Sequence, residues 1–378
     1  MPSSHRTILR PFALQQGQAV PQADPFAVIE TETPRLDENE VLHLVREQYG
    51  LEAELKVLLS ERDQNFRLRC NDGRQFVLKI ANAAEDPIAT DFQIQALLYL
   101  ESWLADNDCP ISVPQILRTV DDKTHVIVSS AGDQHVTRVV SYVDGIPLGD
   151  RRASPVLSRR LGEYLAHLGR ALKGFEHAGS GHGLLWDMQQ ALQIRRILEH
   201  VPGDELRQRI SNVLDGFETF ALPQFSDIRS QVVHSDFNPE NVLIDPDDHD
   251  TVAGVIDFGD MVKAPLIVDV AIGASYLRES EGNPLAGIAE FLLGYHTVTP
   301  LDLAEIDILF DLIKTRLAAS VAILSWRATL RGADDPYLAG AIASEGGAAE
   351  FLKSLMELPR EHAQQAFRQV CAGGQAES

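Results

Sequence analysis

The sequence has few cysteines and no long hydrophobic run. Its three cysteines lie far apart without Cys-x-x-Cys spacing, so neither a disulfide framework nor a structural zinc site is expected. No stretch of 18 apolar residues occurs, and the longest candidate, Leu266–Leu277, is interrupted by Asp269. A membrane-spanning helix is therefore not expected. The first residues also lack the basic and then apolar order of a signal peptide, which favours a cytoplasmic protein.

Basic residues are scarce as well. The 378 residues include 33 Lys and Arg against 55 Asp and Glu, which gives a formal net charge of −22. A field of this sign repels phosphate backbones and anionic lipids, so we expect neither a nucleic-acid nor a membrane partner. It suits an amine-containing small molecule. The length and the 44% of hydrophobic residues are typical of a globular protein with room for two lobes.

The apolar pattern divides the chain into three parts. Residues 1–35 are rich in Pro, Gln, Ser and Thr without periodicity, which indicates a flexible N-terminal tail. Residues 36–144 contain short alternating runs typical of strands, and we expect them to form an N-terminal, nucleotide-binding lobe. Residues 145–378 carry long amphipathic helices interrupted by one β-hairpin. We expect them to form a helical C-terminal lobe with the catalytic loop and the substrate pocket.

The middle part begins with a helix and continues as a sheet. Asp37 and Glu40 have the spacing of a capping box, and Gly50 is a helix stop. The expected strands are Leu55–Leu59, Phe66–Cys70, Phe76–Ile80, Thr124–Ser129 and Val136–Tyr142, with a helix over about 91–104 after the third strand. The chain is thus predicted to have an α+β fold, with a small antiparallel sheet lobe and a larger, mainly helical lobe.

The hairpin in the helical part carries polar residues in a fixed order. His234, Ser235 and Asp236 are followed by Asn241, then by two apolar strands and Asp257-Phe258-Gly259. Phosphoryl transfer needs such a set, because its loose transition state is stabilised mainly by positioning and by charge. Asp236 can orient a substrate hydroxyl and accept its proton, while Asn241 and Asp257 can supply oxygen ligands to Mg²⁺. The motif predicts a kinase with Asp236 as its catalytic residue.

A kinase also needs a cation that holds the nucleotide phosphates from a strand of the small lobe. Lys79 lies in the apolar strand Phe76–Ile80, where a lysine needs a partner to offset its burial. The turn Ser60–Phe66, which contains Asn65, lies between the first two strands, where backbone N–H groups can cover the phosphates. The turn has no glycine. We predict that Lys79 and Asn65 belong to the nucleotide site.

These motifs resemble the aminoglycoside phosphotransferase and choline kinase superfamily. Within it, Ser60–Phe66 and Gly254–Asp260 are similar to the corresponding segments of hydroxylysine kinase-like enzymes, and the likeness spans about residues 36–330. The resemblance implies a protein-kinase-like bilobal fold, ATP or GTP as donor, Mg²⁺, and an amino alcohol or hydroxy amino acid as acceptor. It also implies that Ser141 and Val143, in the connector between the lobes, meet the purine through backbone groups.

The same resemblance implies that Asp269 braces the catalytic loop, and it exposes two departures. Gln93 stands where kinases place the glutamate that pairs with the lysine. Either Gln93 is a neutral partner of Lys79, or Asp91 takes that role. Ser235 replaces the glycine that small-molecule kinases commonly carry between the histidine and the aspartate.

The acceptor is less well defined by the sequence. Trp186 and Asp187 can offer an aromatic face and a carboxylate to an ammonium group, and equally fit a helix start with a buried tryptophan. Arg316 and Trp326 can bind a carboxylate or serve packing and surface charge. Homoserine, choline, ethanolamine and aminoglycosides therefore stay open as acceptors beside hydroxylysine.

Two other classes of protein are disfavoured. A kinase-like binding module without transfer usually lacks one of the four key groups, and Lys79, Asp236, Asn241 and Asp257 are all present. A protein kinase would carry a glycine-rich loop and an Ala-Pro-Glu segment, and this chain has neither.

Overall fold

The computed structural model describes residues 33–374 apart from 61, 131, 150, 280–281, 332–337, 340 and 343–346. Most of the predicted tail, residues 1–32, lies outside the described residues. The chain divides into two compact units, one formed by Met1–Leu98 with Pro114–Tyr142 and the other by Tyr99–Val113 with Val143–Ser378.

The first unit begins with the predicted capped helix, α1 (Glu38–Tyr49). The Asp37 side chain accepts a hydrogen bond from the Glu40 backbone N–H at 2.9 Å, and Glu40 accepts one from the Asp37 N–H at 3.2 Å. Gly50 ends the helix with a φ of +64°, a conformation that costs glycine little. The capping box and the stop are therefore both confirmed.

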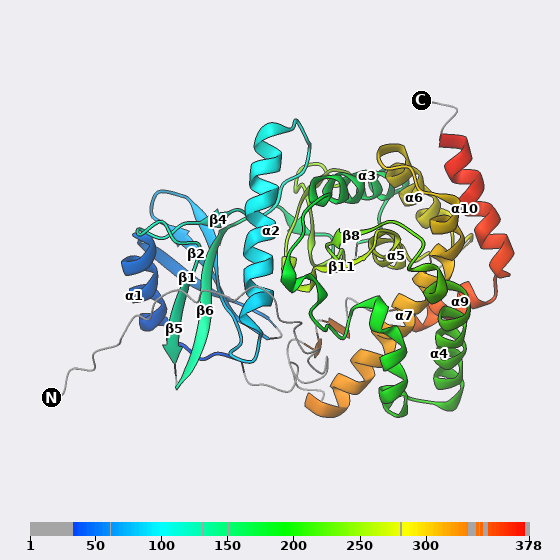
Figure 1. The fold of residues 1–378 in the computed structure, drawn as a ribbon, viewed down its shortest axis with the longest axis horizontal. Coiled ribbons are helices and arrows are strands. Elements are labelled where there is room, and N and C mark those ends of the chain that lie inside the picture. The colour runs from blue at the N-terminus through cyan, green and yellow to red at the C-terminus, as the bar shows by residue number, and fades with distance from the viewer. Residues whose placement is uncertain are drawn as a thin grey trace. The chain divides into compact units, whose positions relative to one another are not determined.

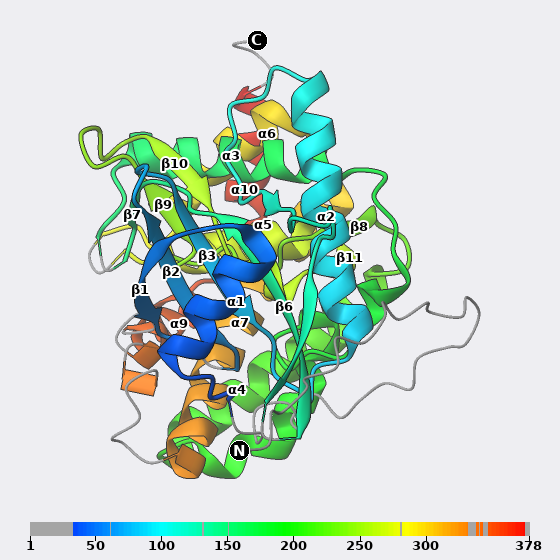
Figure 2. The same ribbon diagram turned by 90° about the vertical axis from the view of Figure 1, so that its left-hand side faces the viewer.

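Six antiparallel strands form the sheet of the first unit, in the order β1-β2-β3-β6-β4 with β5 paired to β6. They are β1 (Ala53–Leu58), β2 (Gln64–Cys70), β3 (Gln75–Ile80), β4 (Ile116–Leu117), β5 (Val126–Ser130) and β6 (Asp133–Ser141). One face of the sheet forms a core with α1, which lies beside β1 in Figures 1 and 2. Phe66, Leu78 and Val139 occupy one row of this face, so the opposite face is left for polar groups.

The helix after β3, α2 (Pro87–Asp106), is longer at both ends than the predicted 91–104. The division between the two units falls within it, between Leu98 and Tyr99. The short strand β4 was not predicted, because two apolar residues give no readable alternation.

The second unit is mainly helical. Its α-helices are α3 (Pro155–Leu172), α4 (Asp204–Gly216), α5 (Ile267–Ser275), α6 (Ala286–Val298), α7 (Leu303–Arg331), α9 (Ala348–Met356) and α10 (Arg360–Gly374). Gly162 of α3 and Gly294 of α6 let these two backbones approach closely, because a Cβ on either would collide with the other helix's backbone. Within the part predicted to carry long amphipathic helices, Met188–His200 forms the 3₁₀ helix η3. The helix α10 lies beside α6 in Figure 1.

Two small antiparallel sheets interrupt the helices. One has the order β10-β9-β7, formed by β10 (Val252–Val255), β9 (Val242–Ile244) and β7 (Ile146–Pro147), and its strands lie together in Figure 2. The other pairs β8 (Ser230–Val233) with β11 (Val262–Pro265). The predicted polar motif lies in the loops between these strands. Within the described part of the chain, no helix has the length and apolar character needed to cross a membrane.

Candidate active site

The loop between β8 and β9 is shaped by its own side chains. The side-chain oxygen Oδ1 of Asn238 accepts hydrogen bonds from the backbone N–H groups of Glu240 at 2.9 Å and Asn241 at 3.1 Å. Such a local turn is typical of asparagine, whose short side chain reaches the backbone two or three residues ahead. It brings Asn241 back toward Asp236.

The Asp236 carboxylate is held at both oxygens. Asn238 Nδ2 donates to Oδ1 at 2.8 Å, and Asn241 Nδ2 donates to Oδ2 at 2.6 Å. Arg316 Nη2, from α7, lies 3.6 Å from Oδ1. The side chain keeps 21% of its exposure. The carboxylate is thus fixed in orientation and still reachable.

The surroundings of Asp236 favour its neutral form. Burial and, after it, the negative charges of Asp260 and Asp257 raise the pKa of Asp236 to about 7. The positive charge of Arg316 and the hydrogen bond from Asn238 lower the pKa of Asp236 against this trend. A carboxyl group with a pKa in this range can accept a proton near neutral pH.

Asp269, at the start of α5, holds the backbone of the loop by hydrogen bonds. Its two carboxylate oxygens accept the backbone N–H groups of His234 at 2.9 Å and Ser235 at 2.7 Å. Burial raises the pKa of Asp269 to about 6, opposed by these two hydrogen bonds. The contacts confirm that Asp269 supports the loop.

Ser235 adopts a left-handed backbone conformation, with φ at +64°. This conformation is costly for residues with a Cβ and nearly free for glycine. The geometry explains why a glycine suits this position, and it shows that serine is accommodated there, with its backbone N–H bound to Asp269.

His234 links the loop to the following strand. Its Nδ1 accepts the Asp236 backbone N–H at 3.3 Å, and its Nε2 lies 3.2 Å from the Ile256 carbonyl oxygen, where it donates. The ring also contacts Phe258 edge-on, with centroids 4.8 Å apart. Burial lowers the pKa of His234 to about 4, so the ring is neutral. A neutral ring with one donor and one acceptor matches both bonds.

The predicted metal ligands, Asn241 and Asp257, come from neighbouring ends of two paired strands. The Ile256 N–H donates to the Asn241 carbonyl at 2.9 Å, and Asp257 is the next residue. Because Asn241 uses its Nδ2 on Asp236, its oxygen Oδ1 is the atom that a cation can meet. Among the described residues, no three His, Cys, Asp or Glu side chains form a metal cluster. One amide and one carboxylate fit Mg²⁺, which takes few protein oxygens and completes its shell with phosphates and water.

In the first unit, Asn65, Lys79 and Arg138 form one row across the sheet. Asn65 of β2 is directly opposite Lys79 of β3, which is directly opposite Arg138 of β6. Residues opposite each other in adjacent strands point to the same face. The predicted nucleotide residues Asn65 and Lys79 therefore share the face not covered by α1, together with a second cation that the sequence did not reveal.

Gln93, on α2, contacts this row. Its side-chain carbonyl accepts a hydrogen bond from Arg138 Nη2, and its Nε2 donates to Glu85 at 3.2 Å. Gln93 thus forms a hydrogen bond with Arg138, the cation directly opposite Lys79 in the sheet. Asp91, the alternative partner, accepts a hydrogen bond from Gln95 Nε2 at 3.2 Å.

The two predicted purine-binding residues fall in different units. Ser141 ends β6, where its backbone N–H donates to the Gln115 carbonyl at 2.8 Å and its Oγ accepts the Gln115 N–H at 2.9 Å. Val143 belongs to the second unit, where it packs on Gly254 of β10. A Cβ at Gly254 would collide with Val143, so glycine is required there.

Trp186 has two arginine partners. The guanidinium carbons of Arg316 and Arg327 lie 4.6 and 5.1 Å from its ring centroid. Asp187 caps η3 by accepting the Gln189 backbone N–H at 2.9 Å, which is the helix-start role considered above. Trp326 is buried on α7, 5% exposed.

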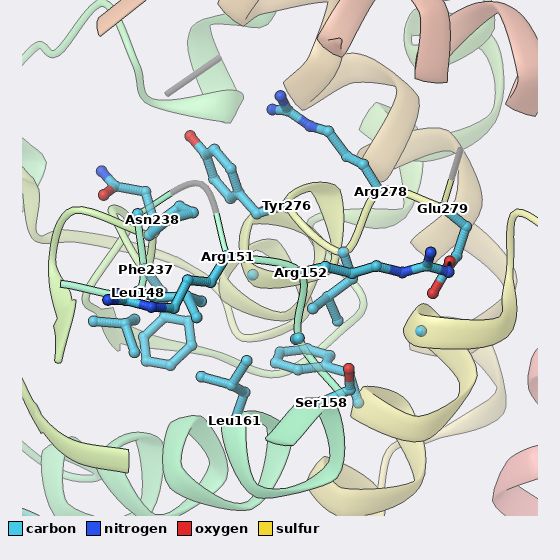
Figure 3. Close-up of a pocket in the computed structure, with 18 residues that line it drawn as sticks. Leu148, Arg151, Arg152, Ser158, Leu161, Phe237, Asn238, Tyr276, Arg278 and Glu279 are labelled. Carbon is cyan, nitrogen blue, oxygen red and sulfur yellow. Dashed lines mark hydrogen bonds and ion pairs between the residues drawn. The ribbon is translucent and has the colours of Figure 1, made fainter. Parts of the chain in front are cut away.

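A cavity of about 320 Å³ adjoins the catalytic loop (Figure 3). Phe237 and Asn238 of the loop line it, as does Tyr276, whose hydroxyl accepts a hydrogen bond from Arg316 Nη2 at 3.0 Å. Figure 3 shows Arg152 and Glu279 pointing toward one another on its wall, where they form an ion pair.

Three polar residues of these sites were missed from the sequence. Asn238 follows Asp236 by two residues, a spacing that allows an asparagine turn and was readable. Arg327 follows Arg316 by 11 residues, three helical turns, so the two share a helix face. Arg138 is revealed only by the strand register.

Comparisons with known proteins agree with this geometry. Residues 54–303 match the family described as phosphotransferase enzyme family. Hydroxylysine kinase of Xenopus laevis is 25% identical over 333 residues, which cover 83% of this chain and 88% of the relative.

Two solved structures share the fold. One is the amicoumacin kinase hAmiN in complex with AMP-PNP and Ca²⁺, with a TM-score of 0.63, 18% identity and coverage of 83% and 94% of the two chains. The other is the microcompartment-associated aminopropanol kinase, with a TM-score of 0.65, 18% identity and coverage of 84% and 98%. The predicted protein-kinase-like α+β fold is therefore confirmed.

Proposed function

The chain belongs to the phosphotransferase enzyme family and is a small-molecule kinase, and we propose that it transfers the γ-phosphate of ATP or GTP to the hydroxyl of an amino alcohol or hydroxy amino acid. Hydroxylysine is the first acceptor to test. The observation that carries this proposal is the orientation of the Asp236 carboxylate by the side-chain amides of Asn238 and Asn241. Asn241 is itself a candidate metal ligand, and its backbone carbonyl is bonded to the residue before Asp257, the other candidate.

In this mechanism Asp236 aims the acceptor hydroxyl and takes its proton as the new O–P bond forms, while the bond from the γ-phosphorus to the β,γ-bridging oxygen breaks and ADP or GDP leaves. Its raised pKa supports the role, because a stronger base accepts the proton more readily. Asn241 and Asp257 would hold Mg²⁺, which neutralises charge on the phosphates when bound. Asp269 and His234 keep the loop in place.

The nucleotide in this proposal is held by the first part of the chain, residues 36–144. Lys79 and Asn65 would face the phosphates, Gln93 would fix the cationic row through Arg138, and Ser141 and Val143 would meet the purine through backbone groups. Residues 145–378 would supply the catalytic loop and the acceptor pocket. The nucleotide analogue in the hAmiN complex supports a nucleotide co-substrate.

Two observations support a small, amine-bearing acceptor. The cavity beside the catalytic loop, about 320 Å³, is at the lower end of the size range of small-molecule sites. Relatives named hydroxylysine kinase and a fold neighbour named aminopropanol kinase act, by their names, on compounds that carry both a hydroxyl and an amine.

The proposal is tested by measuring nucleotide consumption with Mg²⁺ and ATP or GTP across hydroxylysine, homoserine, choline, ethanolamine and an aminoglycoside. We expect release of ADP or GDP that depends on one acceptor, with hydroxylysine or another amino compound the best. Nucleotide binding without turnover on any acceptor would favour a binding module. Absence of nucleotide binding would overturn the proposal.

A further inference from the structure

Lys79 has a second cation beside it on the face of the sheet that α1 leaves uncovered. Arg138 of β6 is directly opposite Lys79 of β3, and Asn65 of β2 is directly opposite Lys79 on its other side. Side chains at directly opposite positions leave their strands about 5 Å apart, so long ones reach the same place. The register therefore puts two cations and an amide next to each other.

Both neighbours of Lys79 are buried and incompletely bonded. Arg138 is only 3% exposed and Asn65 only 9%. Arg138 Nη2 donates to the side-chain carbonyl of Gln93, but Arg138 Nη1 and Asn65 Oδ1 have no hydrogen-bond partner in the described part of the chain. Because buried polar atoms are nearly always bonded in folded proteins, two such atoms in one row point to a ligand that completes them.

The partner of Arg138 is an amide and not an acid. Among the described residues Arg138 forms no ion pair, and Gln93 offers it a neutral oxygen. The carboxylate of Glu85 lies one hydrogen bond further away, where it accepts from Gln93 Nε2 at 3.2 Å and from Thr90 Oγ1 at 3.0 Å. Gln93 thus holds the guanidinium in place without cancelling its charge.

The acid behind Gln93 is itself held away from its charged form. Burial, and after it the negative charge of Asp63, raise the pKa of Glu85. The positive charges of Arg62 and Arg138 lower this pKa, but the net direction is upward. A raised pKa favours the neutral carboxyl group, so Glu85 offsets the charge of Arg138 only in part.

We infer that Arg138 is a second determinant of phosphate binding beside Lys79, and that its positive charge, oriented by the neutral Gln93, raises affinity for a nucleoside triphosphate. The inference rests on the proposed function, which puts the nucleotide phosphates at Lys79 and Asn65. A charge in the protein interior is screened less than one in water, so it acts on phosphates a few ångströms away. A glutamate at position 93 would pair with Arg138 and cancel this effect.

The test compares ligands that differ only in their phosphate chain. Affinities for ATP, ADP and adenosine, and for GTP, GDP and guanosine, are measured by calorimetric titration. EDTA is present, so that protein cations alone meet the phosphates. Wild type is compared with Arg138→Met, Arg138→Lys and Gln93→Glu, each in the whole chain. We expect wild type to bind the triphosphate more tightly than the nucleoside.

In Arg138→Met we expect affinity for the triphosphate to fall on the order of 10- to 100-fold, because a cation near the phosphates is lost. Affinity for the nucleoside should change less than about twofold. Arg138→Lys keeps the charge and should lose less. An unchanged ratio of triphosphate to nucleoside affinity in Arg138→Met would overturn the inference.

Gln93→Glu separates charge from packing, because glutamate has nearly the shape of glutamine. If Arg138 only packed the sheet, an acid at position 93 would bind it more strongly and leave the affinity ratio unchanged. We expect instead a fall of about tenfold for the triphosphate and none for the nucleoside. A ratio equal to that of wild type would overturn the inference even if Arg138→Met fails to fold.

Arg46→Met is the matched control. It removes the same charge from the same unit, but Arg46 lies on α1, which packs on the opposite face of the sheet, and is paired with Glu52 at 2.7 Å. Because this charge is exposed and screened by solvent, we expect the affinity ratio to stay within about twofold of wild type. Thermal unfolding of all variants identifies a folding defect.

The result is separate from that of the proposed function. If wild type binds nucleotide and no acceptor supports turnover, the proposed transfer fails, and the inference still holds when Arg138→Met loses the preference for the triphosphate. If an acceptor is phosphorylated and that preference is unchanged, the transfer holds and the inference is overturned. Absence of nucleotide binding in wild type overturns both.

Discussion

The catalytic loop and the group formed by Trp186, Arg316 and Arg327, which we call the arginine–tryptophan cluster, hold their charges by opposite means. In the loop, the negative charge of Asp236 is fixed by neutral amides from two and five residues further along the chain. In the cluster, positive charges are fixed by an aromatic ring and by partners from separate segments, such as Tyr276, 40 residues from Arg316. Arg316 belongs to both, since it also contacts Asp236.

The difference separates a region held by short-range contacts from one held by long-range contacts. Short-range hydrogen bonds leave the loop few alternative conformations, so it can present one group in one orientation. The cluster depends on side chains packed between distant elements, so its geometry depends on several of them at once. Four substitutions test this division, and their expected effects decrease in the order given.

Replacing the base should have the largest effect. Asp236→Ala removes the proton acceptor, and we expect kcat to fall on the order of 10³- to 10⁴-fold. Nucleotide affinity should stay within about twofold, because Asp236 is assigned to the acceptor. Steady-state kinetics and nucleotide titration measure the two effects. A parallel loss of nucleotide affinity would count against Asp236 as the base.

Replacing the candidate metal ligand should act on the nucleotide. In Asp257→Ala we expect affinity for ATP in the presence of Mg²⁺ to fall roughly 100-fold, since the carboxylate that would hold the cation is gone. Affinity measured with EDTA should match that of wild type. Unchanged dependence on Mg²⁺ would show that Asp257 is not a ligand.

Replacing Arg316, which contacts Asp236, should change the pH dependence of kcat/KM. Ionised Asp236 is the active form, so kcat/KM should fall as pH drops through its raised pKa. In Arg316→Gln the positive charge that lowers this pKa is lost, and we expect the acidic limb to move up by about one pH unit. Arg316→Lys keeps the charge and should move it less.

The acceptor for this pH profile should be an amino alcohol, so that carboxylate binding does not enter. If the acidic limb of kcat/KM does not move in Arg316→Gln, Arg316 does not influence the pKa of Asp236.

The smallest effect concerns stability. Ser235→Gly removes a Cβ from a left-handed residue, and we expect the free energy of unfolding to rise by up to about 1 kcal/mol. Ser235→Ala keeps the Cβ and should match wild type. Urea unfolding measures both. If Gly and Ala behave alike, the positive φ at this position carries no strain.

What the sequence could predict follows the same division. The capping box of α1, the strands of the first sheet other than β4 and the loop from His234 to Asn241 depend on neighbours in the chain, and their patterns were readable. Arg138 and the convergence of Arg327 on Trp186 depend on strand register and on the packing of α7, which no local pattern encodes. The sequence therefore predicts the chemistry better than the acceptor.

The two hydrogen bonds of the His234 ring connect the base to the strand that precedes Asp257. The neutral ring joins the backbone of Asp236 to the carbonyl of Ile256, so the base and the residue before Asp257 move as one rigid piece. Substitutions at Trp186 or Arg327 do not touch that piece. The placement of the base relative to the strand that carries the candidate metal ligand Asp257 therefore depends on His234 and not on Trp186 or Arg327.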